Sequence, residues 1–263
     1  MSETPWQALS RELDDWQSAG RQLRLWLRDD DAVAPTPALT RLSALAGRHG
    51  ASVLLAVIPM LAEPDLAPAL RAMPLLRPCQ HGVWHHNHAP AASKKSEFGP
   101  ERAAARVDSE IAQGRDRLSD LLGEAILPVF VPPWNRIDPG HAARLGGLGF
   151  AALSCFRNHR HGASGGPPLL NTHIDIMDWH GGRIGRRPED LLPEMVALLA
   201  GIRDSHAEQT VPIGLLLHHR DHDENAWTLL DDILAATAAH PAVTFTDPAE
   251  LLQSAQPLSL RAT

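Results

Sequence analysis

The chain has 263 residues, of which 44% are hydrophobic, so it can bury a sizeable core in one or two domains without cross-links. Its two cysteines, Cys79 and Cys155, are too few for a disulfide framework or a cysteine-rich zinc site. A formal net charge of −7 argues against a basic nucleic-acid groove. The 19 glycines and 22 prolines are spread along the chain, which argues against a low-complexity disordered protein.

The N-terminal segment 1–6 has neither a basic start nor an apolar run of signal-peptide length. No later stretch reaches the roughly 18 apolar residues of a membrane span. We therefore expect a soluble, cytoplasmic protein with no membrane partner and no nucleic-acid partner.

Helical and strand patterns alternate along the chain. A helix at about 5–18 precedes the first strand, because Trp6, Leu9, Leu13 and Trp16 recur at steps of three and four residues. The predicted strands are 23–27, 51–58, 78–81, 125–131, 150–154, 172–176, 211–217 and 243–245. The predicted helices between and after them are 37–48, 64–73, 101–122, 139–145, 188–202, 224–238 and 248–254.

This alternation predicts an α/β fold with parallel strands. No glycine-rich phosphate-binding turn follows the first strand, so a closed or nearly closed barrel is favoured over an open sheet. Because no repeat or interdomain linker is found, residues 1–263 are predicted to form a single domain. Barrel enzymes carry their chemistry at the C-terminal ends of the strands, and unusual polar residues fall at four such ends here.

The first strand ends in three carboxylates, Asp29, Asp30 and Asp31. Adjacent carboxylates repel one another unless a cation or full solvation compensates. Regular strand alternation would turn Asp29 and Asp31 to the same side. For this segment alone, an exposed acidic turn that caps the helix near Thr36 is the favoured interpretation.

Four histidines lie between His81 and His88. His81 and His85 are four residues apart, so one helical turn would place both rings on one face, where they could bind a metal ion. A polar surface loop is the alternative for this segment.

Another apolar strand ends at His218, which is a catalytic candidate because histidine titrates near neutral pH. His219 and His222 are interpreted as surface histidines. The segment Asp175–Trp179 follows a further strand, and alone it is typical of a strand end with a helix cap. Four tryptophans lie beside these segments and suit either stacking on a sugar ring or core packing: Trp84, Trp134, Trp179 and Trp227.

In this order, the segments resemble the polysaccharide deacetylase family over residues 23–246. The family's aromatic-Asp-Asp-Gly motif is similar to Arg28–Asp31, with arginine for the aromatic residue and aspartate for glycine. Its His-Ser/Thr-x-x-His motif is matched in spacing by His81–His85, and its Arg-x-Pro-x-Gly motif is only partly kept in Val131–Asn135. Its Asp-x-x-Asp-Trp and Leu-x-His motifs are matched by Asp175–Trp179 and Leu216–His218.

The resemblance implies a distorted (β/α)7 barrel and a metal-dependent hydrolase. Such an enzyme removes an acetyl or acyl group from an amino sugar or related carbohydrate amide through a metal-activated water, so the partner is a small-molecule or carbohydrate substrate. Asp30, His81 and His85 would hold one divalent ion, and Asp29 and His218 would be base and acid. Zinc is the expected ion, because two imidazoles and a carboxylate suit it. Either neighbouring aspartate could exchange roles with Asp30.

The remaining residues implied to support the site or bind substrate are Asp31, Trp84, His88, Pro132, Trp134, Arg136, Asp175, Asp178 and Trp179. The family's third-motif arginine, which pairs with the base, is Val131 here. We expect Arg136 to replace it, because Arg28 is adjacent to Asp29 and would point to the opposite side of the strand. Two alternatives stay open: a weak or inactive barrel that keeps a metal and binds a carbohydrate or partner, and an unrelated barrel with a structural metal.

Overall fold

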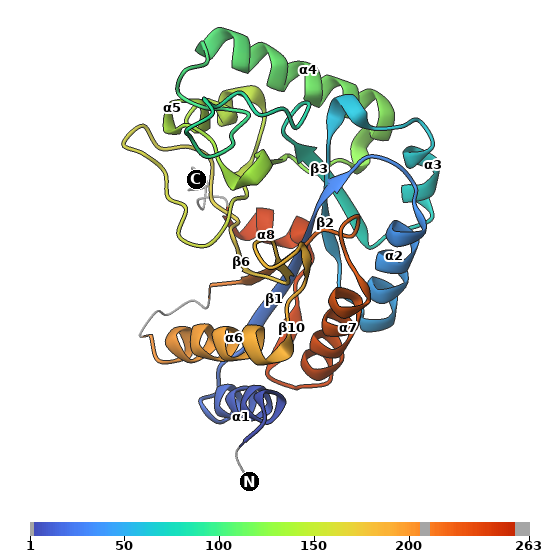
Figure 1. Ribbon diagram of the computed structural model, residues 1–263, viewed down its shortest axis with the longest axis vertical. Coiled ribbons are helices and arrows are strands. Elements are labelled where there is room, and N and C mark those ends of the chain that lie inside the picture. The colour runs from blue at the N-terminus through green and yellow to red at the C-terminus, as the bar shows by residue number, and fades with distance from the viewer. Residues whose placement is uncertain (1–2, 206–210, 256–263) are drawn as a thin grey trace, which may run out of the picture.

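The computed structural model describes residues 3–205 and 211–255, and its centre is a curled parallel sheet (Figure 1). Seven strands follow the order β5-β4-β3-β2-β1-β9-β6, and an eighth, β10, pairs with the start of β1. Their bounds are β1 Leu23–Ala32, β2 Val53–Val57, β3 Leu76–His81, β4 Val129–Val131, β5 Ala152–Leu153, β6 Thr172–Asp175, β9 Ile213–Leu217 and β10 Val243–Phe245.

The two edges of the seven-strand path approach each other through the segment that follows β5. The Arg157 N–H donates to the Thr172 carbonyl (2.6 Å), and the Thr172 N–H donates to the Cys155 carbonyl (3.0 Å). These bonds join β5 to β6 without a full strand between them. The predicted distorted (β/α)7 barrel is therefore confirmed.

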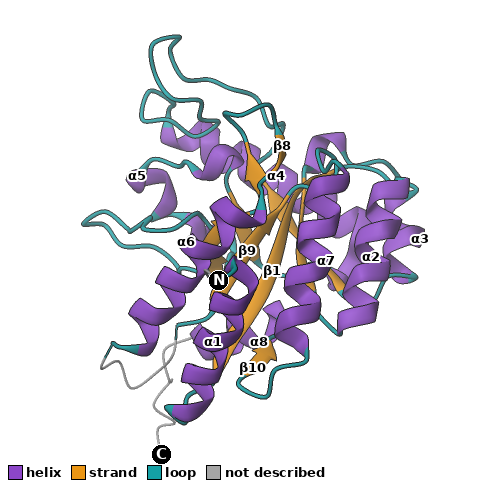
Figure 2. Ribbon diagram, turned by 60° about the horizontal axis from the view of Figure 1, so that its bottom comes forward, coloured by secondary structure: helices purple, strands orange, loops and turns teal. Residues whose placement is uncertain are grey.

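Helices cover the outside of the sheet (Figure 2). Their bounds are α1 Pro5–Ser18, α2 Pro37–His49, α3 Leu66–Arg71, α4 Ala104–Leu122, α5 Pro139–Ala142, α6 Pro188–Arg203, α7 Glu224–Ala238 and α8 Pro248–Ala255. The largest buried cluster lies between α1, α2, α6 and α7 and the outer face of the sheet. None of the described helices is both long enough and apolar enough to cross a bilayer.

Alternation along β1 gives the sheet its two faces. Leu25 and Leu27 pack with the outer helices, whereas Trp26 packs with interior residues such as Leu54 and Val131. Continuing this alternation directs Arg28 into the barrel, toward the end where the strands finish.

A short antiparallel hairpin, β7 (Met177–Asp178) with β8 (Ile184–Gly185), follows β6 and was not predicted. Strands of two residues are too short to produce a periodic hydrophobic pattern. Most other elements differ from the predicted bounds by a few residues at their ends; the helix predicted from residue 101, for example, begins at Ala104.

Candidate metal centre and active site

A bulge in β1 turns Asp31 into the barrel mouth. Leu27 and Asp29 pair with Val53 and Leu55, but Ala32 pairs with Val57, so β1 carries one extra residue in this stretch. Asp31 lies in the left-handed region, with φ of +72°. A bulge of this kind breaks the alternation of side chains. Asp31 therefore does not share a side with Asp29, contrary to the sequence expectation.

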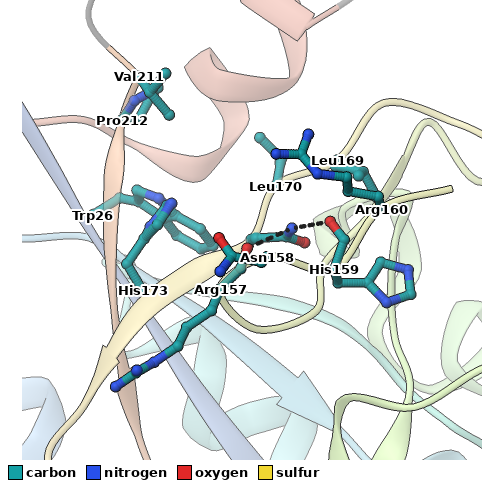
Figure 3. A pocket seen from close by; sticks show the side chains of 11 residues that line it. Trp26, Arg157, Asn158, His159, Arg160, Leu169, Leu170, His173, Val211 and Pro212 are labelled. Carbon is teal, nitrogen blue, oxygen red and sulfur yellow. Dashed lines mark hydrogen bonds between the residues drawn. The ribbon is translucent and has the colours of Figure 1, made fainter. Parts of the chain in front are cut away.

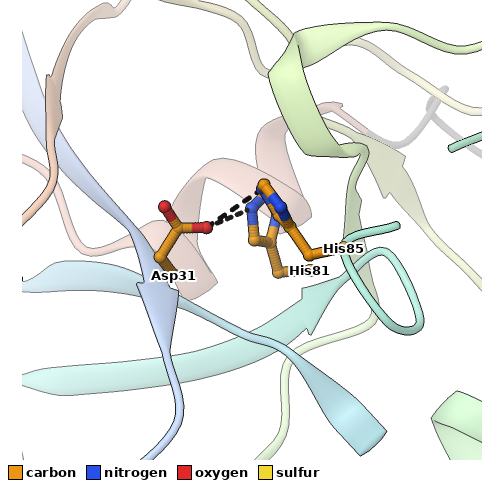
Figure 4. Close-up of side chains that lie close together, drawn as sticks. All are labelled: Asp31, His81 and His85. Carbon is orange, nitrogen blue, oxygen red and sulfur yellow. Dashed lines mark hydrogen bonds and ion pairs between the residues drawn. The ribbon is translucent and has the colours of Figure 1, made fainter. Parts of the chain in front are cut away.

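Asp31 meets His81 and His85 in a compact cluster (Figure 4). Its Oδ1 lies 3.1 Å from His81 Nε2 and 3.2 Å from His85 Nε2. For metal–ligand bonds of about 2.0–2.1 Å in a tetrahedral site, neighbouring ligand atoms lie about 3.3 Å apart. Two imidazole nitrogens and one carboxylate oxygen thus fit a divalent ion with a fourth position left for water.

The two histidines reach the cluster differently from the sequence expectation. His81 ends β3, and its Nδ1–H donates to the Val131 carbonyl (3.0 Å), so Nε2 faces Asp31. His85 is not one helical turn further on. Instead, left-handed residues at Gly82 (φ +53°) and His85 (φ +59°) fold the chain back and bring the two ring centroids to 5.2 Å.

Asp31, His81 and His85 change one another's pKa values. Burial raises the pKa of Asp31, but the hydrogen bond from His81 and the charges of His81, His85 and His218 outweigh it and lower that pKa. Burial lowers the pKa of His81, and the charges of Asp30 and Asp31 more than offset it. Burial and the charge of His81 lower the pKa of His85. A cation would therefore displace a proton held between His81 and Asp31.

Asp30, which the family resemblance implied as a metal ligand, is instead held by Arg28. The Arg28 side chain is fully buried; its Nη2–H donates to Asp30 Oδ2 (3.0 Å), and its Nε lies 2.9 Å from Oδ1. Further N–H groups of Arg28 donate to Asn135 Oδ1 (2.5 Å) and Ser154 Oγ (2.8 Å). Arg28 and Asp30 meet because residues two apart on a strand share a face. This pair holds Asp30 beside the cluster of Asp31, His81 and His85 rather than in it.

The expectation that Arg136 replaces the missing third-motif arginine is wrong. Arg136 Nη1–H donates to the Lys95 carbonyl (2.9 Å) at an exposed position. Arg28 supplies the buried guanidinium from the strand that carries Asp30. The spacing of two residues between Arg28 and Asp30 is the sequence signal that could have predicted this pair, because such residues share one face of a strand.

Asp29, assigned as the base, lies on the outer face of the sheet. Its carboxylate accepts the backbone N–H of His219 (2.8 Å) and the ring Nδ1–H of His219 (2.5 Å), and both side chains are fully buried. His222 Nε2 accepts the His218 N–H (3.2 Å). His219 is therefore not a surface histidine, because it is the partner of a buried carboxylate.

His218 follows β9 and lies close to Asp30. Its Nε2 lies 4.0 Å from Asp30 Oδ2, and its ring packs edge-on against Trp179 with centroids 4.6 Å apart. The Trp179 Nε1–H donates to Asp175 Oδ2 (2.8 Å), and burial raises the pKa of Asp175. Asp178 instead accepts backbone N–H groups of the turn that follows it.

The remaining predicted residues divide into two groups. Trp134 lies 4.4 Å from the His85 ring, between centroids, and Pro132 precedes it in the same turn. Trp84 and His88 lie on an exposed part of the loop after β3, where Trp84 is 42% exposed. Trp134 and Trp179 therefore border the site on two sides, whereas the rings of Trp84 and His88 pack against His86 outside the cluster.

A cavity of about 240 Å³ lies elsewhere and shares no residue with the cluster (Figure 3). It is lined by Trp26, Arg157, Asn158, His159, Arg160, Leu169, Leu170, Asn171, His173, Val211 and Pro212. His173 Nδ1 accepts the Gly214 N–H (3.1 Å), and burial with the charge of Arg157 lowers the pKa of His173 to about 4. The chemical groups of the motifs gather at the mouth and not here.

No family model matches the chain, and no curated protein matches its sequence. Solved structures do match its fold. One is a protein from Mycobacterium smegmatis described as a polysaccharide deacetylase, with TM-score 0.67 and 14% identity over 90% of this chain and 91% of that one. Another is a family 4 acetyl xylan esterase from Clostridium thermocellum in complex with a cobalt ion, with TM-score 0.55 and 14% identity over 88% and 91%. A third is a mutant family 4 carbohydrate esterase pseudoenzyme with restored activity, with TM-score 0.55 and 12% identity over 89% and 68%.

Proposed function

We propose that this chain, which has the fold of the polysaccharide deacetylases, is a metal-dependent hydrolase of C–N bonds other than peptide bonds. Its substrate class is an acetylated or acylated amino sugar or a related carbohydrate amide. The observation that carries the proposal is the cluster of Asp31, His81 and His85 at the barrel mouth, with Asp30 and His218 beside it. The buried pair of Arg28 with Asp30 supports the proposal, because Arg28 can serve the role of the missing third-motif arginine.

Asp31, His81 and His85 are the proposed ligands of one divalent ion, with zinc expected from the donor set. When bound, such an ion lowers the pKa of a water molecule and polarises an acyl carbonyl. Asp31 is assigned the ligand role that the resemblance implied for Asp30, because the β1 bulge presents Asp31 to the histidines.

Asp30 is the proposed general base. Arg28 holds its carboxylate in one orientation by a buried, charge-assisted pair, and a remaining lone pair of that carboxylate can accept the proton of the attacking water. His218, whose Nε2 lies 4.0 Å from Asp30 Oδ2, donates a proton to the departing nitrogen. Each proton transfer contributes roughly 10²- to 10⁴-fold in rate.

The carbohydrate class rests on the borders of the site and on its structural neighbours. Trp134 and Trp179 flank His85 and His218 and offer ring faces or edges to a sugar. The neighbours include an acetyl xylan esterase. A pseudoenzyme with the same fold supports the second candidate, a barrel that binds a metal and a carbohydrate without turnover.

Purified protein, stripped of metal and reloaded with zinc or cobalt, is assayed on N-acetylglucosamine oligomers and on 4-nitrophenyl acetate. We expect one ion per chain and metal-dependent acetate release. The Asp31→Asn variant loses both, whereas His86→Ala, an exposed neighbour of His85, keeps both. One bound ion without acetate release from any acylated sugar favours the second candidate; no bound ion contradicts both.

A further inference from the structure

We propose that Glu97, a buried carboxylate outside the metal cluster, is a positioning residue that sets the affinity of the site for its divalent ion. The proposal rests on the proposed function, because it concerns the same cluster. Nothing in the motifs pointed to Glu97, which follows His85 by a long loop and precedes α4.

The Glu97 carboxylate accepts two backbone hydrogen bonds from the turn between His81 and His85. Glu97 is only 1% exposed. Its Oε1 accepts the Trp84 N–H (2.8 Å), and its Oε2 accepts the Val83 N–H (3.1 Å). Val83 and Trp84 are the two residues directly before His85. One carboxylate therefore satisfies both backbone donors of the segment that delivers the second imidazole.

The Glu97 carboxylate also packs directly against Gly82, where only glycine leaves room for it. A Cβ on Gly82 would lie 2.2 Å from Glu97 Oε2, and Gly82 has a φ of +53°. Any larger residue would displace Glu97 and would be strained in this backbone region. The left-handed turn that folds His85 back toward His81 is thus built together with the Glu97 carboxylate.

Glu97 is itself firmly anchored. The Arg102 Nη1–H donates to its carbonyl (3.0 Å), and the next residue, Phe98, is fully buried against Phe130 with ring centroids 5.4 Å apart. The turn is therefore tied to a buried hydrophobic cluster that contains Val83, Phe98 and Phe130.

This connection matters because metal–ligand distances tolerate only about 0.2 Å. Without the Glu97 carboxylate, the Val83 and Trp84 N–H groups lose their acceptor. The turn can then shift, which moves His85 Nε2 away from Asp31 Oδ1. Partners that orient metal ligands typically contribute about 10–100-fold in metal affinity. We expect a loss of that size without Glu97, although Glu97 does not touch the ion.

The test compares the wild type with Glu97→Gln and Glu97→Ala by titrating metal-free protein with Co²⁺ against a competing chelator. The visible Co²⁺ spectrum reports ligand geometry directly, and urea unfolding of the metal-free forms reports folding. Gln keeps the shape and one acceptor oxygen but presents an amide to the other N–H, so its affinity falls less than that of Ala. Glu101→Gln, an exposed change in the same segment, is the matched control and leaves affinity and spectrum unchanged.

Weaker Co²⁺ binding in the order wild type, Gln, Ala, with an altered spectrum and a folded Gln variant, supports the proposal. Affinity within twofold of wild type and an unaltered spectrum in Glu97→Gln and Glu97→Ala overturn it while leaving the proposed function intact. If Ala does not fold, the Gln variant alone decides. A wild type that binds no Co²⁺ overturns the proposed function and this inference together.

Discussion

The pair between Arg28 and Asp30 offers the sharpest test of how the site is assembled. We consider Arg28→Met, which keeps the length of the side chain and removes its charge. The Arg28 and Asp30 side chains are 0% and 4% exposed. Breaking one partner of such a buried pair costs about 3–5 kcal/mol, because the other charge is left buried without compensation.

The free energy of unfolding of the metal-free protein, measured by urea denaturation at pH 7, should fall by about 3–5 kcal/mol in Arg28→Met. Adding Asp30→Asn to the same chain should recover part of this loss, since the unpaired charge is then removed. The coupling between the two changes should reach about 1–3 kcal/mol, as for groups in direct contact. Arg136→Met is the control and should stay within about 0.5 kcal/mol of wild type.

Measuring kcat of Arg28→Met tests the role of the same pair independently of stability. With Arg28 absent, Asp30 has no fixed orientation toward the water, so kcat should fall while Co²⁺ affinity changes little. A loss of stability under about 1 kcal/mol, or strictly additive effects of the two changes, would refute the idea that these side chains form one buried unit.

Three further predictions follow from other contacts. Asp31→Asn should abolish Co²⁺ binding, whereas Asp30→Asn should keep it and lose most turnover; the reverse result would return the ligand role to Asp30. Asp29→Leu should leave the buried His219 unpaired and lower the free energy of unfolding by about 3 kcal/mol or more, and urea denaturation that finds under about 1 kcal/mol would contradict this. Burial and the charge of Arg157 lower the pKa of His173 to about 4 in the folded protein, so folding disfavours protonation of this ring. The contribution of neutral His173 to the free energy of unfolding should therefore be fully present above pH 6.5. Up to about 3 kcal/mol should be lost as the pH falls from 6.5 to 4, and His173→Asn should flatten this fall in unfolding curves; an unchanged slope would argue against it.

Local patterns in the chain were enough to predict the barrel and the collection of polar residues at its mouth. Helix and strand periodicities depend on neighbouring residues, so the alternation was visible without any tertiary contact. The spacing of His81 and His85 and the position of His218 after an apolar strand were equally local. Because parallel strands finish at one end of a barrel, these local signals predicted which segments meet.

The sequence alone could not decide which aspartate faces the histidines or which arginine supports the base. A strict period of two places Asp29 and Asp31 on one side, and only the register of β1 against β2 reveals the extra residue that turns Asp31 inward. That register is set by pairing between strands far apart in the chain. Arg28 likewise finds its acceptors across the barrel, on residues such as Ser154 and Asn135.

The sequence by itself determined the fold class and the inventory of chemical groups, because both follow from local periodicity and motif spacing. Only the tertiary structure decided their roles: Asp31 with the histidines, Asp30 with Arg28, and Glu97 behind His85. The first contact depends on the register of β1 against β2, the third on a left-handed turn held by a carboxylate further along the chain, and the placing of Arg28 on its acceptors across the barrel. Such contacts are fixed by packing over long sequence distances, which no pattern of neighbouring residues records.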